Sequence, residues 1–150
     1  MQEMLYLSIA VGLLVNLVTV DIFGVILGGF IVPGYLALAI TDPQYIIQVF
    51  LVAMATVFIV MMLGNIMIIY GRKMLVMSVL VGYLLNWLLH DLGIWQMAGP
   101  GGGHFGLIIP GLMAYWMQRQ GIIITAALSV TGAVVIRLIL VLVTGGTVSL

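Results

Sequence analysis

Charged side chains are nearly absent from this sequence of 150 residues. It contains 4 Lys or Arg residues and 4 Asp or Glu residues, 5% of the chain, whereas a soluble domain carries about 25%. So few charges cannot cover a water-exposed surface, which excludes a soluble globular domain. Four basic residues are also too few for a nucleic-acid-binding footprint. Hydrophobic residues make up 65% of the chain, which excludes disorder and predicts an integral membrane protein.

Cysteine is absent and histidine occurs only twice. The lack of cysteine excludes a disulfide framework and a Cys-based metal site, and no metal centre is predicted. No G-x-x-x-x-G-K-[ST] motif is present, so nucleotide binding of that kind is not expected. The apolar run 4–20 follows no basic residue and precedes no small-residue cleavage site. We therefore interpret it as a retained membrane segment rather than a signal peptide.

The few charges divide the chain into apolar runs that are each close to the length of a membrane-spanning helix. A spanning helix needs about 20 apolar residues. The sequence therefore predicts one all-α membrane domain over residues 1–150, a polytopic helical bundle. About six membrane segments are expected, at 4–20, 22–41, 43–71, 74–89, 105–118 and 121–143.

Two of these runs contain a Pro-Gly pair at corresponding places. Pro33-Gly34 is followed by Tyr35, and Pro110-Gly111 lies 77 positions later. Each pair lies in the second of three apolar runs, which indicates an inverted 3+3 repeat with halves at about 1–72 and 73–150. Proline and glycine favour a break that exposes backbone groups inside the membrane. These five residues form a predicted broken-helix site, although a plain proline kink or a re-entrant segment also fits.

Loop-borne positive charge indicates an orientation. If all six segments cross, the connection that holds Arg72 and Lys73 and the one that holds Arg119 lie on the same face, which we expect to be cytoplasmic. Both clusters can act as topology anchors or as a docking surface for a partner or an anionic substrate. The predicted docking residues are Tyr70, Gly71, Arg72, Lys73, Gln118, Arg119 and Gln120.

Arg137 interrupts the last apolar run about 15 residues, or roughly 22 Å, from its start. A charge at that depth is costly and marks a candidate functional site. The alternatives are that the side chain reaches the interface or pairs with Asp42 or Asp91.

Three blocks resemble one known family. They are Ile31-Val32-Pro33-Gly34-Tyr35-Leu36, Ile69-Tyr70-Gly71-Arg72-Lys73, and residues 106–121 from Gly106 to Gly121. In order and spacing the chain resembles the membrane protein C family of bacterial poly-γ-glutamate (capsule) synthesis. The resemblance implies a multi-pass protein of the bacterial inner membrane.

The same resemblance implies partners. It implies a Mur-ligase-like, ATP-dependent amide ligase that this chain anchors, other membrane-anchored synthase subunits, and poly-γ-glutamate as the exported polymer. ATP and a divalent metal are expected in the ligase and no cofactor is expected in this chain. Its own role in catalysis is left open between non-catalytic and co-catalytic, and homo-oligomerisation is also left open.

Two other functions fit the residues. The inverted repeat also suits a stand-alone carrier or channel for a small solute. His90, Asp91 and His104 have side chains that do acid–base chemistry, so a membrane-embedded transferase is the second alternative. No Ser or Cys nucleophile is marked by a motif, and catalytic residues are therefore not assigned.

Overall fold

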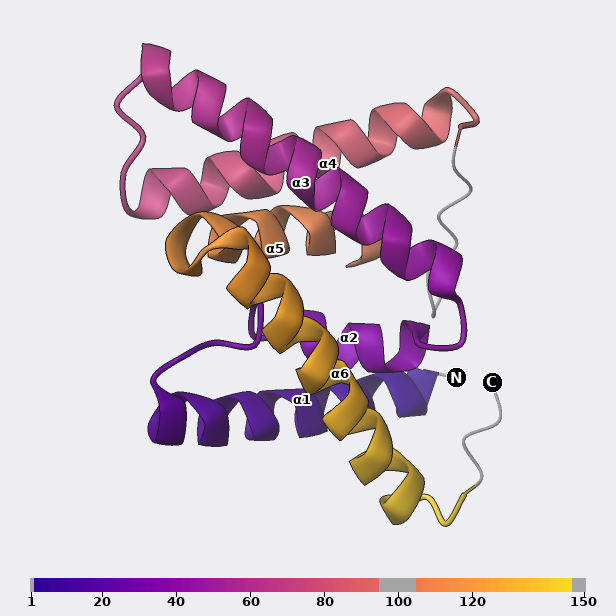
Figure 1. Cartoon of the computed structure of the whole chain (residues 1–150). Coiled ribbons are helices and arrows are strands. Elements are labelled where there is room, and N and C mark those ends of the chain that lie inside the picture. The colour runs from indigo at the N-terminus through magenta and orange to yellow at the C-terminus, as the bar shows by residue number, and fades with distance from the viewer. Residues whose placement is uncertain (1, 95–104, 147–150) are drawn as a thin grey trace.

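The chain is seen here as a computed structural model that describes residues 2–94 and 105–146, and every regular element in those ranges is a helix (Figure 1). This confirms the predicted all-α fold class. The helices are α1 (Gln2–Phe23), α2 (Val32–Ala39), α3 (Pro43–Ile66), α4 (Arg72–Asp91), α5 (Phe105–Gln120) and α6 (Ile122–Val143).

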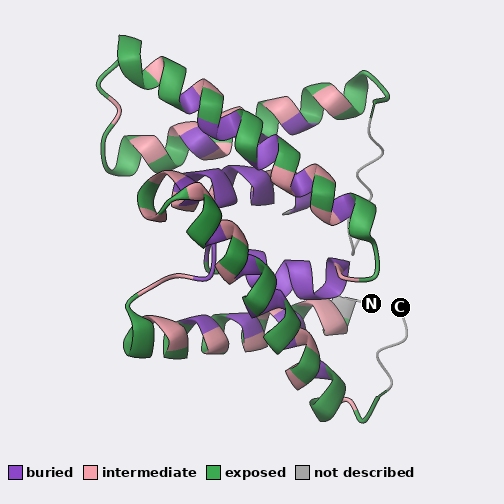
Figure 2. Cartoon of the chain, viewed as in Figure 1, coloured by how far each residue is buried: buried purple, intermediate pink, exposed green. Residues whose placement is uncertain are grey.

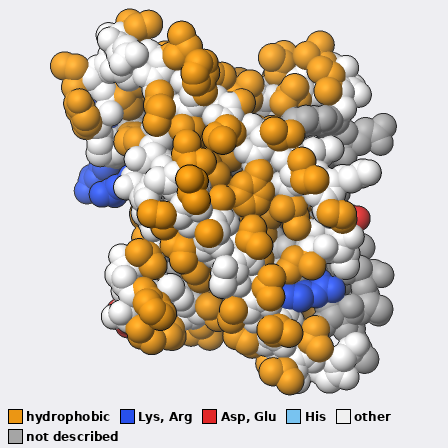
Figure 3. Space-filling view, viewed as in Figure 1, with side chains coloured by type: hydrophobic (Ala, Val, Ile, Leu, Met, Phe, Trp, Pro, Cys, Tyr) orange, Lys and Arg blue, Asp and Glu red, His pale blue; other side chains and the backbone are white. Residues whose placement is uncertain are grey.

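Four of these helices are long and apolar enough to cross a membrane, namely α1, α3, α4 and α6. Their outward side chains are largely exposed and apolar (Figures 2 and 3), as expected for helices surrounded by lipid. The chain is therefore a membrane protein. Helix α2 has 8 residues and α5 has 16, fewer than the roughly 20 that a spanning helix needs. The expectation of about six spanning segments is thus larger than the four helices that qualify.

The first Pro-Gly segment is interrupted before its proline rather than at it. Residues 24–31 form no helix, and Gly24, Gly28 and Gly29 have φ values of +66°, +77° and +134°, which glycine adopts more readily than other residues. Helix α2 then starts with Pro33 in its first turn, where the missing N–H removes no helical hydrogen bond.

The second Pro-Gly segment is not broken. Helix α5 is continuous from Phe105 to Gln120 with Pro110 inside it, so the predicted break at Pro110 is wrong. A proline inside a helix frees the carbonyl four residues earlier, here that of Gly106. The side-chain amide of Asn86 in α4 donates a long hydrogen bond of 3.4 Å to this carbonyl. The neighbouring helix therefore replaces the lost bond, and α5 does not unwind.

The two halves exchange their third helices. Helices α1 and α2 pack against α6, whereas α4 and α5 pack against α3 (Figure 1). All eight residues of α2 are buried, and most of the described residues of α5 are buried or half-buried at the centre of the bundle (Figure 2). The main apolar core joins α2, α3, α5 and α6, with Tyr35, Leu36, Val49, Val57 and Met113 among its members.

The two ends of the bundle differ in charge. At one end, on the left in Figure 1, α1, α3 and α5 finish while α4 and α6 begin. This basic end carries Arg72, Lys73 and Arg119 against one acid, Asp21. The opposite, acidic end carries Glu3, Asp42 and Asp91, with Arg137 six residues before the end of α6.

Candidate functional site

In each half an asparagine donates to the carbonyl four residues before the proline. The Asn16 amide of α1 donates to the Gly29 carbonyl at 3.2 Å, and the Asn86 amide donates to Gly106. Gly29 and Gly106 each lie four residues before a proline. The Asn16 side-chain oxygen also accepts from the Leu27 N–H at 3.1 Å, whereas that of Asn86 is buried without a partner.

Glycine pairs bring these helices into backbone contact. A Cβ on Gly12 would lie 2.9 Å from the Cα of Gly34, and a Cβ on Gly82 would lie 2.5 Å from the Cα of Gly111. No side chain fits at such a crossing. The glycine that follows each proline is therefore needed for close packing of α2 on α1 and of α5 on α4.

A repeated spacing in the sequence marks these contacts. Ser8, Gly12 and Asn16 recur as Ser78, Gly82 and Asn86, 70 positions later in each case. All six lie on the faces of α1 and α4 that contact α2 and α5. Our sequence reasoning missed this pattern. Comparing the first runs of the two halves residue by residue would have found it.

The predicted site residue Tyr35 packs in the core of the bundle. It is 1% exposed, and its ring lies 6.0 Å from that of Tyr45 in α3. A Cβ on Gly106 would lie 3.1 Å from the Tyr35 hydroxyl and 3.0 Å from the Tyr45 hydroxyl. The two tyrosines thus join α2 and α3 to the start of α5.

Arg137 contacts the end of α2. Its guanidinium donates to the Ala37 carbonyl at 3.2 Å, across 100 residues of sequence. Ala37 is in the last turn of α2, where carbonyls lack helical partners and a positive charge is favourable. No ion pair with Asp42 or Asp91 is seen, all three side chains being among the described residues. The side chain is half-buried, so part of it also faces outward.

The basic end contains a hollow of about 330 Å³ between α4 and α5. It is lined by Gly71, Arg72, Leu75, Val76, Tyr115 and Arg119. The structure thereby brings together Arg72 and Arg119, which belong to different connections in the sequence. Arg119 donates to the Tyr115 hydroxyl at 3.1 Å, and its guanidinium lies 5.8 Å from the Tyr115 ring and 6.0 Å from the Trp116 ring.

The other predicted docking residues divide into two sets. Tyr70 is 80% exposed and Lys73 is also exposed, so both are available to a partner. Gln118 donates to the Ser78 hydroxyl at 3.2 Å. Gln120 donates to the Ile26 carbonyl and accepts from the Ile26 N–H. The two glutamines therefore hold α5 to α4 and to the non-helical stretch 24–31.

His90 and Asp91 lie in the last turn of α4 and are exposed. His104, the third residue of the transferase alternative, lies outside the described residues. Within the described ranges, no group of three His, Cys, Asp or Glu residues is placed to hold a metal ion.

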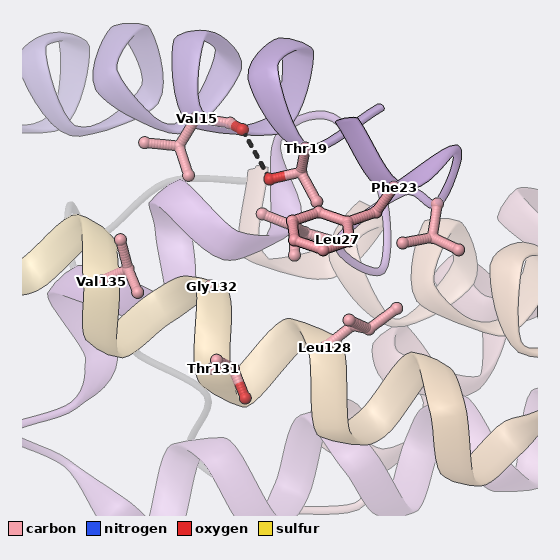
Figure 4. Close-up of a pocket in the computed structure, with 9 residues that line it drawn as sticks. Val15, Thr19, Phe23, Leu27, Leu128, Thr131, Gly132 and Val135 are labelled. Atoms are coloured by element: carbon pink, nitrogen blue, oxygen red, sulfur yellow. Dashed lines mark hydrogen bonds between the residues drawn. The ribbon is translucent and has the colours of Figure 1, made fainter. Parts of the chain in front are cut away.

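A second hollow, of about 470 Å³, lies between α1, the stretch after it and α6 (Figure 4). Leu27, Leu128 and Val135 contribute to a largely apolar lining. The hydroxyls of its two threonines, Thr19 and Thr131, are bonded back to carbonyls of their own helices. An apolar lining of this kind suits hydrocarbon rather than a polyanion.

Over the described residues, the fold and these contacts define a small helical membrane protein in which two sets of three helices make equivalent interactions. The particular family follows from sequence. The chain belongs to the Capsule biosynthesis CapC family, whose sequence model matches residues 11–126. This confirms the resemblance drawn from the three blocks.

Two relatives match most of the chain. The chain is 34% identical over 125 residues to "PGA biosynthesis protein CapC" of Bacillus subtilis (strain 168), which covers 81% of this chain and 83% of the relative. It is 32% identical over 129 residues to "Capsule biosynthesis protein CapC" of Bacillus anthracis, with the same coverage of each chain. No solved structure matches the chain significantly.

Proposed function

We propose that this chain is a multi-pass inner-membrane subunit of a bacterial poly-γ-glutamate synthase and export complex. One observation carries the proposal. The family match over residues 11–126 includes both Pro-Gly segments, both asparagines that serve them and the basic end. The names of the two relatives, which refer to PGA and capsule biosynthesis, supply the pathway.

We propose that the basic end faces the cytoplasm. It carries three positive charges and one negative charge, whereas the acidic end has three acids and one arginine. Positive residues near the ends of spanning helices are retained on the cytoplasmic side. The charge difference between the ends therefore supports this orientation.

The proposed task of the basic end is to anchor a cytoplasmic, Mur-ligase-like amide ligase. Forming an amide from a carboxylate requires activation by a nucleotide, and this sequence has no Walker-type motif. We assign ATP and the divalent metal to that ligase. The docking surface is defined here as Ile66, Ile68, Tyr70 and Lys73. The first three are 84%, 83% and 80% exposed, and they precede the positive charge of Lys73 in the sequence.

The polymer is proposed to pass along the Pro-Gly segments toward Arg137. A guanidinium can bind a carboxylate through two parallel hydrogen bonds, which suits a chain of glutamyl carboxylates. The half-buried position of Arg137 at the end of α2 supports this role.

Deleting the gene for this chain should abolish exported polymer while leaving the ligase expressed. The measurement is the amount of poly-γ-glutamate outside the cells, with a plasmid-borne copy of the chain as the control. Normal export by the deletion strain would refute the proposal.

Changing the docking surface should weaken the recovery of ligase. We expect the double variant Tyr70→Ala/Lys73→Glu to retain at most about a tenth of the ligase in co-purification, because it removes an apolar contact and reverses a charge. The matched control is Leu142→Ala, since Leu142 is 81% exposed near the acidic end. Equal recovery with both variants would place the docking surface elsewhere.

A stand-alone carrier is favoured by a different observation, the equivalent contacts of the two halves. Co-purification separates the two proposals. A carrier would be recovered without any ligase and would move a solute after reconstitution alone, whereas a synthase subunit requires the complex.

A further inference from the structure

We propose that the hollow between α4 and α5 at the basic end binds the phosphate of an anionic phospholipid. This goes beyond the function proposed above, because it assigns a ligand to Arg72 and Arg119 that is neither polymer nor ligase. It uses none of the four residues of the docking surface.

Two arginines provide the phosphate contact. Both Arg72 and Arg119 line the hollow and both are exposed, so their guanidinium groups are accessible from outside. Arg119 is held in place by the hydroxyl and ring of Tyr115 and by the ring of Trp116. A guanidinium fixed in this way loses less freedom when it binds a phosphate.

The hollow lies at the depth of lipid headgroups. Arg72 is the first residue of α4, one of the four helices able to span the membrane, and Arg119 is the residue before the last of α5. A charge at the start of a spanning helix, here Arg72, lies where lipid phosphates do, and Arg119 lines the same hollow. Basic pockets between membrane helices are recognised binding places for anionic headgroups.

One wall of the hollow suits an acyl chain. Leu75 and Val76 line it and are 37% and 59% exposed. Leu80, four residues after Val76 on the same face of α4, is 50% exposed. An apolar strip therefore runs from the arginines toward the middle of the membrane. A phospholipid can place its phosphate at the arginines and its hydrocarbon tail along the apolar strip. Polyglutamate has no hydrocarbon tail and would leave the strip uncovered.

The test measures lipid binding to the purified full chain by native mass spectrometry. The probes are phosphatidylglycerol and phosphatidylcholine with the same acyl chains. We expect the wild type to bind phosphatidylglycerol about tenfold more tightly than phosphatidylcholine, because only the former has a net charge for the arginines. Equal affinities would overturn the proposal.

Variants locate the binding in the hollow. Arg119→Ala should weaken phosphatidylglycerol binding about tenfold, while Lys73→Ala, which removes one neighbouring charge outside the hollow, should change it less than about twofold. Val76→Asn should weaken binding without any change of charge, because it interrupts the apolar strip. Equal losses in the Arg119 and Lys73 variants would indicate a diffuse charge effect and refute the site.

Competition distinguishes the lipid from other anions. Inorganic phosphate and a soluble oligomer of γ-glutamate should fail to displace phosphatidylglycerol at matched concentration. Displacement by either would show a general anion site and overturn the lipid assignment. Lipid binding is measured on the purified chain without ligase, so the proposal on the ligase and the proposal on the lipid fail separately.

Discussion

At the residue scale, Asn86 explains how Pro110 is accommodated inside α5, and Asn16 bonds the carbonyl at the corresponding place before Pro33. A buried carbonyl without a partner is costly in lipid, where no water can replace the lost bond. Asn16 and Asn86 each donate a hydrogen bond to such a carbonyl from an adjacent helix. The sequence already showed the asparagines and the prolines separately, but only the packing of α1 on α2 and of α4 on α5 relates them.

Asn86→Ala should destabilise the protein less when Pro110 is also replaced by Ala. Residue 110 then regains an N–H that can bond the Gly106 carbonyl, so the Asn86 amide is no longer needed. We expect the loss of unfolding free energy caused by Asn86→Ala to be about 1 kcal/mol smaller in the Pro110→Ala background than in the wild type. Thermal unfolding in detergent micelles measures both losses.

The control for this cycle is Asn65→Ala, since Asn65 is exposed on α3 and should have little effect. Asn16→Ala should cost more than Asn86→Ala, because the Asn16 side chain makes a second bond, to the Leu27 N–H. Identical losses from Asn86→Ala in both backgrounds would show that Asn86 does not replace the proline's missing bond.

Arg137→Ala should lower the unfolding temperature, because the end of α2 loses a donor and a favourable charge. We expect Arg137→Ala to lose about 1–2 kcal/mol of the free energy of unfolding. The stability of Arg137→Lys should lie between those of the wild type and Arg137→Ala. Polymer export measured in the same strains tests the other proposed role of Arg137, on the route of the polymer. Export should drop by more than the loss of folded protein accounts for. An alanine variant as stable as wild type would contradict the capping role.

At the element scale, the same Pro-Gly pair has different consequences in α2 and α5. In the first half, glycines at positive φ precede the pair and the helix starts only at Val32. In the second half, the helix is already formed at Phe105 and passes through Pro110. What precedes the pair therefore decides whether the segment is a short helix or a continuous one. The pair itself was predicted as a break in both places.

Gly82→Ala should force α4 and α5 apart. The added Cβ would lie 2.5 Å from the Cα and 2.7 Å from the backbone nitrogen of Gly111, and backbone atoms cannot move aside as a flexible side chain can. We expect a loss of about 1–3 kcal/mol in thermal unfolding. In Gly64→Ala the new methyl meets nothing within 4 Å, so this variant should be neutral or more stable by up to about 1 kcal/mol. The reverse order of stabilities would argue against the observed crossing.

At the scale of the whole molecule, exchange of the third helices joins the halves into one bundle. Helix α6 covers α1 and α2, and α3 covers α4 and α5, so neither half buries its second helix with its own residues alone. The boundary between halves at 72 and 73 stays a prediction. The equivalent serine, glycine and asparagine contacts support it.

Single-cysteine labelling should place the two ends in different compartments, and the chain has no native cysteine to remove. Tyr70→Cys and Ile123→Cys at the basic end should react with an impermeant maleimide only after the cells are opened. Asp42→Cys and Leu92→Cys at the acidic end should react in intact cells. Labelling of positions 70 and 123 from different compartments would refute the arrangement in Figure 1.

The sequence by itself determined that this protein is surrounded by lipid and that its secondary structure is helical. With 5% charged residues and apolar runs near the length of a span, the chain can satisfy its backbone in lipid only through helices. The spacing of the three blocks was also enough to indicate the family. These properties depend on composition and on the succession of residues along the chain, and neither requires the packed structure.

Only the tertiary structure decided which helices are long enough to span, where the chain breaks and which distant residues meet. The bonds from Asn16 to Gly29 and from Asn86 to Gly106, the cap that Arg137 gives to α2, and the hollow that Arg72 and Arg119 share all join distant segments of the chain. In lipid an apolar face has no preferred partner by hydrophobicity alone. Close backbone contacts and hydrogen bonds between helices select the arrangement, and they exist only once the helices are packed.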